Sequence, residues 1–262
     1  MRRLFSTIAV IGVILILFFA INYFTKKPLE GEETFSAKSI ANIDLNSDVA
    51  TISILPTNSN DIKVIWEGKS KMFGKTEVDI EQDSETLHID IGRIKIFNFL
   101  QFGFNFNSLD VDVFLPEKLY DSINLRNNVG STLISGIKTD ELTVHTDVSD
   151  MTIEGVHAND IKAESAVGDI VLKNSHGIVD VKNDVGDITI VTEAITDDME
   201  LITNVGGVSI VLEEIPSDTS FNANTEVGTV TVFGERGSYV LKQSDYLVTI
   251  NTDVGDINVE VN

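Results

Sequence analysis

Aspartates at one point of a recurring motif carry the clearest chemistry in this sequence. Carboxylates stand directly before or after a Val-Gly pair, or the equivalent of that pair, in several copies of the motif. The preceding positions are Asp147, Asp184 and Asp253, and the following positions are Asp150, Asp169, Asp187 and Asp256. Clustered carboxylates supply the hard oxygen ligands that calcium prefers, so these seven residues are candidate calcium ligands.

The motif that contains them occurs seven times in the second half of the chain and once near its start. It reads apolar-x-apolar-x-small polar-x-Val-Gly-Asp-apolar-x-apolar, most clearly in VDVKNDVGDITI. The central valines are Val49, Val129, Val148, Val167, Val185, Val205, Val227 and Val254. Apolar residues stand six and four positions before each valine, and a small hydrogen-bonding residue stands two positions before it. This alternation predicts a β-strand with one buried face.

A second alternating strand follows the valine, with apolar residues three and five positions after it in seven of the eight copies. Because three residues rather than two separate the valine from the next inward side chain, the chain must turn there. Glycine follows the valine in six copies, which suits a positive φ. Ser149 and Ala50 replace that glycine in the other two copies. We expect a different conformation, or strain, at those two corners.

These corners predict an all-β fold, a single-stranded β-solenoid of right or left hand, whose rungs of about 19 residues stack on one another. From Val129 to Val205 the valines are 19, 19, 18 and 20 residues apart, and the later spacings are 22 and 27. We expect each repeat to stack on the preceding one. A sandwich of regularly spaced hairpins is the alternative fold.

Stacking of the rungs would bring the aspartates of neighbouring repeats close together. Carboxylates on neighbouring rungs would lie about 4.8 Å apart and repel one another by roughly 0.9 kcal/mol per pair even in water. Calcium ions between the rungs would relieve this repulsion. Alternatively, the side chains accept hydrogen bonds from backbone amides at the turn or extend into solvent.

Residues 4–24 form an almost uninterrupted apolar run that is long enough to cross a bilayer. We expect an N-terminal transmembrane helix that stays attached, because the end of the run lacks the small-x-small pair of a signal-peptidase site. A cleavable signal peptide is the alternative. The short N-terminal tail favours a cytoplasmic N-terminus and an extracytoplasmic C-terminal domain, so the membrane is the first expected partner.

The sequence divides into an anchor at 1–27, a linker at 28–41, an irregular β module that caps the solenoid at 42–126, and regular repeats at 127–262. The formal net charge is -22, which disfavours nucleic acid as a partner. The chain contains no cysteine, so it has neither a disulfide framework nor a thiolate nucleophile.

Two segments of the irregular module, GKSKMFGK and GRIKIFNFLQFGFNFNSL, are basic and rich in phenylalanine. Aromatic and basic side chains anchor proteins at membrane interfaces, so we expect contact with lipid or with a membrane partner. The candidate contacts are Lys69, Lys71, Phe73, Phe97, Phe99, Phe102, Phe104 and Phe106. Alternatively, the phenylalanines cover the open end of the solenoid core.

Catalysis has less support in the sequence. The four histidines show no metal-ligand spacing, and neither a nucleophile elbow nor a phosphate-binding loop is present. A carbohydrate-active β-helix enzyme would use paired carboxylates in a groove with aromatic platforms, and the sole tryptophan, Trp66, lies far from the aspartates. We therefore expect no catalytic residues and no cofactor other than calcium.

The stretch LPEKLYDSINLRNNVGS and the Val-Gly-Asp corners at Val167, Val185 and Val254 carry a resemblance that covers about residues 5–262. The chain resembles a bacterial family of exported β-strand-repeat proteins of unknown function, labelled "putative adhesins". It looks most like LiaG-like membrane-anchored proteins, which are encoded beside regulators of cell-envelope stress. The resemblance implies a binding or scaffold protein of the cell envelope, linked to stress response or adhesion, with an envelope protein or wall polymer as partner. A calcium-stabilised adhesin is a further alternative.

Overall fold

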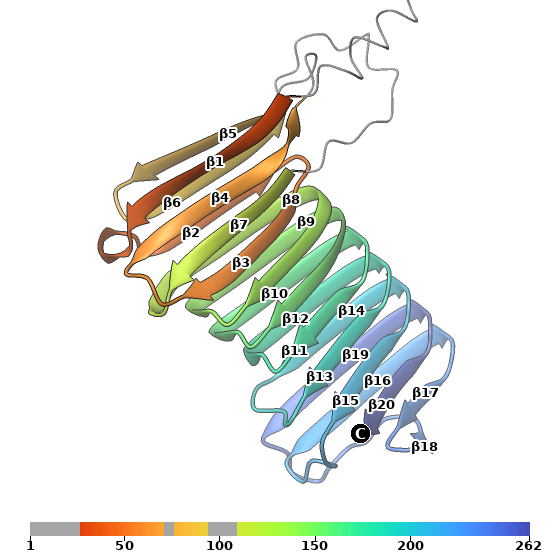
Figure 1. The fold of residues 1–262 in the computed structure, drawn as a ribbon. Coiled ribbons are helices and arrows are strands. Elements are labelled where there is room, and N and C mark those ends of the chain that lie inside the picture. Colours follow the sequence, from red (N-terminus) through yellow and green to blue (C-terminus); the bar gives the residue numbers. More distant parts are fainter. Residues whose placement is uncertain (1–26, 71–75, 94–108) are drawn as a thin grey trace, which may run out of the picture.

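A computed structural model describes residues 27–262, apart from 71–75 and 94–108. In these ranges, twenty strands form one continuous sheet that bends at a row of corners into two facing layers (Figure 1). The strand pairs between successive rungs are parallel, so the fold is solenoid-like and not a sandwich of hairpins. The expected anchor at 4–24 lies outside the described residues. In the part of the chain that is described, no helix is long and apolar enough to cross a membrane.

The first layer contains, in spatial order, β5 (Thr76–Asp83), β6 (Thr86–Arg93), β2 (Asn42–Ser47), the first halves of β8 (Leu119–Ser135) and β9 (Lys138–Glu154), β10 (His157–Val167), β12 (His176–Val185), β14 (Met199–Val205), β19 (Tyr246–Val254) and β16 (Thr219–Val227).

The second layer contains β1 (Lys27–Ser36), β4 (Asp61–Ser70), β7 (Leu109–Pro116), β3 (Thr51–Thr57), the second halves of β8 and β9, β11 (Ile170–Lys173), β13 (Ile188–Thr192), β15 (Val208–Leu212), β20 (Ile257–Val261), β17 (Val230–Val232) and β18 (Glu235–Arg236). A short 3-10 helix, η1 (Ala37–Ser39), follows β1.

The register of the strands aligns the repeats as the sequence predicts. Val167 pairs with Val148 on one side and with Val185 on the other. The inward columns are therefore continuous from rung to rung, and most of their members are buried almost completely, as at Ile161, Val179, Leu201 and Ile250, which are at most 1% exposed. These columns fill the space between the two layers and form the core.

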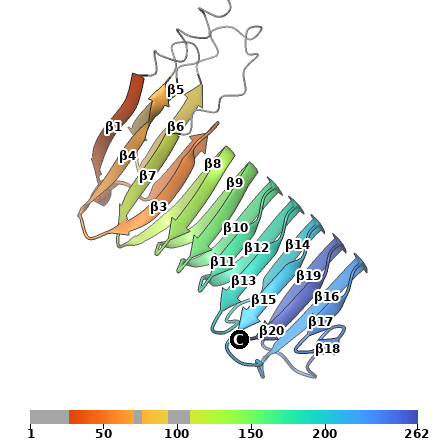
Figure 2. The same ribbon diagram turned by 45° about the vertical axis from the view of Figure 1, so that its right-hand side comes forward.

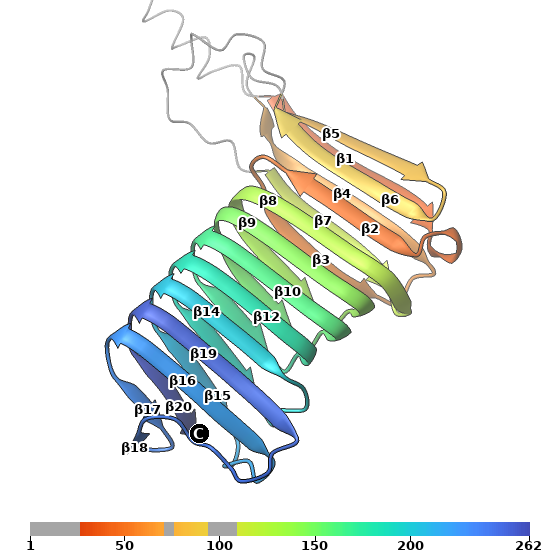
Figure 3. The same ribbon diagram turned by 180° about the vertical axis from the view of Figure 1, so that it is seen from behind.

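The expected order of the rungs is wrong at the C-terminal end. β14 pairs with β19 and β15 pairs with β20, so the last repeat lies between the two repeats that precede it (Figures 2 and 3). β16 and β17 form the outermost rung instead. After β17 the chain crosses the end of the stack. Phe233 and Tyr239 pack edge-to-face there, and the backbones of Phe221 and Tyr239 form an isolated antiparallel β-bridge. The chain then continues into β19, between β14 and β16.

At the other end, antiparallel strands close the stack. β5 pairs with β6, and β4 lies between β1 and β7. The linker expected at 28–41 is instead part of this folded module, because β1 pairs with β4 along all ten of its residues. The Lys118 ammonium fixes the same segment by donating to the carbonyl oxygens of Ala37, at 2.7 Å, and Ile40. β2 and β3 stack directly on β8, so the repeat around Val49 continues the regular solenoid.

The glycine corners are positions of close backbone approach. A Cβ atom on Gly186 would lie 2.1 Å from the Gly168 carbonyl oxygen of the adjacent rung, and φ at Gly186 is 138°. Equivalent contacts place a Cβ on Gly206 2.0 Å from the Gly186 carbonyl oxygen. Ser149 and Ala50 are not among the residues with positive φ, so those two corners have a different conformation, as expected.

The small polar column two residues before the valine hydrogen-bonds the same corners from inside. Asn183 donates to the Gly168 carbonyl at 2.9 Å, and Thr252 donates to the Gly206 carbonyl at 2.9 Å. The Thr203 hydroxyl donates to the Gly186 carbonyl at 3.2 Å. These three side chains satisfy carbonyl groups that the turn removes from the strand ladder. The hydroxyls of Ser47, Thr146 and Ser165, in the same column, are buried without a hydrogen-bond partner among the described residues.

A disulfide experiment tests the order of the rungs, and the absence of native cysteine keeps the result unambiguous. Glu200 pairs in register with Thr249, about 4.8 Å away on the neighbouring parallel strand, so Glu200→Cys/Thr249→Cys is expected to form a bond on mild oxidation. Glu200→Cys/Asn222→Cys spans two strands and should stay reduced. Non-reducing electrophoresis and mass spectrometry distinguish the pairs. A disulfide bond in the second pair alone would show that the repeats stack in the order of the sequence.

A glycine substitution tests the corner contact. We expect Gly186→Ala to lower the free energy of unfolding by about 3 kcal/mol, because the added methyl meets a backbone carbonyl and φ is left-handed. Gly92→Ala is the control, because a Cβ there meets nothing within 4 Å. Urea denaturation measures both variants, and equal stabilities would show that the corners tolerate a side chain.

Candidate functional site

The aspartates that follow the corner form a hydrogen-bonded series along the stack. The Asp150 carboxylate accepts a hydrogen bond from the backbone amide of Asp169 at 3.0 Å, and Asp169 accepts one from the amide of Asp187 at 2.9 Å. Asp187 continues the series by accepting from the amide of Gly207 at 2.7 Å. Each carboxylate therefore acts as a bridge between two rungs.

The last member of this column behaves in the same way, because Asp256 accepts from the Thr229 amide at 2.7 Å. Hydrogen bonds from backbone amides to these carboxylates offset part of the repulsion between rungs. Within the described ranges, no three His, Asp or Glu side chains form a group that could hold a metal ion. The geometry thus favours the amide-acceptor alternative, and calcium binding remains a prediction.

The aspartates that precede the corner do not converge either. Asp147 lies 3.5 Å from the Nε2 atom of His145, and Asp184 accepts from the side-chain amide of Asn204 at 3.1 Å. Asp253 is exposed on β19. Asp184 therefore links two neighbouring rungs, and none of the three aspartates belongs to a group of described side chains that could hold a metal ion.

The central valine of the motif is on the surface, which the sequence did not indicate. Strict alternation would place this valine on the inward side, but the corner rotates it outward. The exposed fractions run from 45% to 63%. The exposed members are Val148, Val167, Val185, Val205, Val254 and Val227, in the order in which they stack. They form an apolar ridge along the row of corners.

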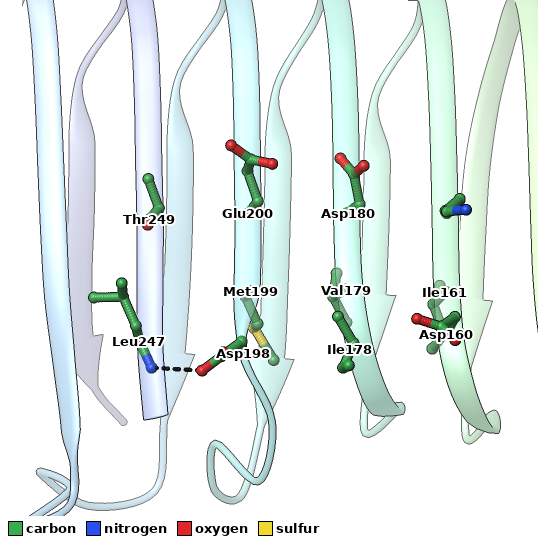
Figure 4. Close-up of a pocket in the computed structure, with 11 residues that line it drawn as sticks. Asp160, Ile161, Ile178, Val179, Asp180, Asp198, Met199, Glu200, Leu247 and Thr249 are labelled. Atoms are coloured by element: carbon green, nitrogen blue, oxygen red, sulfur yellow. Dashed lines mark hydrogen bonds between the residues drawn. The ribbon is translucent and has the colours of Figure 1, made fainter. Parts of the chain in front are cut away.

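A shallow groove lies on the outer surface of the first layer, over β10, β12, β14 and β19, and has a volume of about 390 Å³ (Figure 4). Two outward rows of side chains line it. The row farther from the corners contains Asp160, Ile178, Asp198 and Leu247, and the next row contains Lys162, Asp180, Glu200 and Thr249. Inward residues of the same strands, among them Met199, lie beneath it.

Acidic groups dominate this groove. Four of its side chains are carboxylates and one is a lysine. Asp180 accepts from the Lys182 ammonium at 3.1 Å through one oxygen, and this contact raises the pKa of Lys182, with smaller contributions from Glu200 and Glu164. The other oxygen of Asp180 is buried and has no hydrogen-bond partner among the described residues.

Most of the basic and phenylalanine-rich residues expected to contact a membrane lie outside the described residues. These are Lys71, Phe73, Phe97, Phe99, Phe102, Phe104 and Phe106. The backbone of Lys69 belongs to β4, where it pairs with Pro28. Their role remains a prediction.

The fold defines an all-β repeat protein with a solenoid-like stack of rungs and an acidic groove on one outer face. The chain belongs to the Toastrack DUF4097 family, whose model matches residues 120–260. This assignment confirms the family resemblance seen in the sequence. A search of curated proteins found no match.

The solved structures similar to this chain include the following three. A "putative adhesin" from Bacteroides fragilis is 15% identical with a TM-score of 0.48, and the match covers 90% of this chain and 98% of that one. A "putative lipid binding protein" from Parabacteroides distasonis is 10% identical with a TM-score of 0.47, covering 90% and 97%. A "putative cell adhesion protein" from Clostridium sporogenes is 16% identical with a TM-score of 0.38, covering 90% and 100%.

Thermal unfolding tests the role of the corner aspartates. Asp169→Ala removes the acceptor for the Asp187 amide and is expected to lower the free energy of unfolding by about 1 kcal/mol. Asp169→Asn keeps an oxygen acceptor and should lower the free energy of unfolding by less. The hydrogen-bond account also predicts the same melting temperature in EDTA and in calcium at fixed ionic strength. A calcium-specific rise that Asp169→Asn/Asp187→Asn abolishes would contradict it and identify ion sites.

Proposed function

We propose that this chain is a membrane-anchored, extracytoplasmic rod that binds or scaffolds another component of the bacterial cell envelope. The acidic groove over β10, β12, β14 and β19 carries this proposal, because it combines exposed apolar side chains with the exposed carboxylates of Asp160 and Glu200. Residues 4–24 are the proposed anchor. A link to envelope stress or adhesion is an expectation from the family resemblance.

The regular stack supports a binding or scaffold role. Parallel rungs repeat about every 4.8 Å and share one core, so outward side chains occupy fixed positions along the rod. The antiparallel strands β5 and β1 end the two layers on one side, and the segment through Tyr239 crosses the other end of the stack. The long outer faces between these ends are the proposed surfaces for contact.

The carbohydrate-active alternative has weaker support. Asp180 and Glu200 pair in register on neighbouring strands of the groove, which gives the two adjacent carboxylates that such chemistry needs. The residues that line the groove include no aromatic side chain to stack on a sugar ring. We therefore propose binding without catalysis.

Cysteine labelling in intact cells tests the location. A Ser131→Cys variant places a thiol at an exposed position and is expected to react with a membrane-impermeant maleimide before cell lysis. Ala163→Cys is the matched control, because that position is buried and should stay unlabelled before and after lysis. Labelling of Ser131→Cys only after lysis would place the domain in the cytoplasm and contradict the proposal.

Site-specific photo-crosslinking tests the binding role. A photoreactive residue at Ile178, in the groove, is expected to give a discrete crosslinked product in intact cells. The same residue at Thr189, on the outer face of the second layer, is the control. Products of equal yield from both positions, or from neither, would show that the groove is not a specific contact surface.

A further inference from the structure

We propose that the groove binds a basic, extended peptide segment that presents aliphatic side chains three residues apart. This inference rests on the proposed binding function and names the chemistry of the partner. Three observations carry it: the charge of the groove, the exposure of two large apolar side chains, and the distance between them.

The charge of the groove selects a cation. Lys162 is the only basic residue in its lining, and its ammonium lies 3.8 Å from Glu141, outside the groove. Asp198 accepts a hydrogen bond from the Leu247 amide at 2.9 Å, which fixes this carboxylate at the rim. Asp160 and Glu200 are exposed, so both can pair with a partner's lysine or arginine. Anionic polymers and nucleic acid would be repelled by the same groups.

Two apolar side chains in the groove face solvent. Ile178 is 52% exposed and Leu247 is 45% exposed. They occupy equivalent positions on β12 and β19, and β14 lies between those strands with Asp198 at the matching position. Covering both side chains would remove apolar surface from water, which a compact cation such as a metal ion or a simple polyamine cannot do as well as a peptide.

The spacing favours an extended peptide. Two strand separations place Ile178 and Leu247 about 9.6 Å apart along the rod. A polyproline II segment has three residues per turn and rises about 3.1 Å per residue, so its side chains i and i+3 point the same way about 9.3 Å apart. Aliphatic side chains at i and i+3 would therefore contact Ile178 and Leu247. A basic residue between them would reach Glu200 on β14, and a basic residue before the first aliphatic side chain would reach Asp160, one strand beyond Ile178.

A peptide titration tests this inference on the full-length chain in a neutral detergent. The probe is an acetylated nine-residue peptide of three Leu-Lys-Pro repeats, and its comparison peptides replace every lysine with glutamate or every leucine with serine. Isothermal titration calorimetry is expected to show saturable 1:1 binding of the probe alone. Raising the salt concentration should weaken that binding, because the ion pairs are exposed.

Two pairs of variants separate local from overall charge. Asp160→Asn/Glu200→Gln is expected to weaken binding about tenfold, from the loss of two partly exposed ion pairs. Glu154→Gln/Glu260→Gln makes the same change in net charge at exposed positions of β9 and β20 and should change binding less than about twofold. Ile178→Ser/Leu247→Ser should abolish the preference for the leucine peptide over the serine peptide.

Two outcomes would overturn the inference: no saturable binding of the Leu-Lys-Pro peptide, or equal weakening by both charge-changing pairs. Circular dichroism of each variant confirms that a loss of binding does not come from unfolding. The proposed binding function has a separate test, because crosslinking at Ile178 does not depend on the probe. A crosslinked partner without peptide binding would refute the partner chemistry and leave the binding role in place.

Discussion

The close contact between glycine corners is the constraint on which the rest of the structure depends. At each regular corner, the carbonyl oxygen of one rung occupies the space where a Cβ atom of the next rung would lie. This contact lets the two layers turn at the same point in every rung and keeps the strands in register. The inner Asn and Thr side chains and the outer aspartates then hydrogen-bond across the same gap, from opposite sides of the chain.

The regular stack makes every outward position part of a row, so a single substitution in the motif changes one point of a long surface. Most outward positions near the groove are polar or charged, whereas Ile178 and Leu247 are apolar and exposed. The repeat thus supplies the scaffold, and departures from the repeat supply the chemistry. The same principle applies at the ends, where the aromatic contacts of Phe233 and Tyr239 replace the missing neighbour of the last rung.

Much of the fold follows from the sequence, because alternation and the corner glycine are local signals. The inward columns, the corners and the altered conformation at Ser149 could all be predicted. The order of the last three rungs could not, because the repeats at Val205, Val227 and Val254 all carry the Val-Gly corner and can stack on one another in more than one order. β1 was also missed: its sequence alternates weakly, and its position is marked by Gly31, against which the indole of Trp66 lies.

For the corner aspartates, the sequence left calcium binding and hydrogen bonding to backbone amides open. The positions of the amides in three dimensions were needed to favour hydrogen bonding. The whole groove could not be predicted, because its fourth strand, β19, is distant in sequence from β14 and lies beside it only through the inserted last repeat.

Native-state hydrogen exchange of the corner amides tests the central claim most directly. Gly168, Gly186, Gly206 and Gly255 each donate to the valine carbonyl of the adjacent rung, and Gly206 donates to Val254 of the inserted repeat. If the corners hold the stack together, these four amides should exchange slowly and with similar opening free energies, because one cooperative unit protects them. Rapid exchange at the corners, with slow exchange only in the strands, would show that the strands hold the stack and that the corners merely connect them.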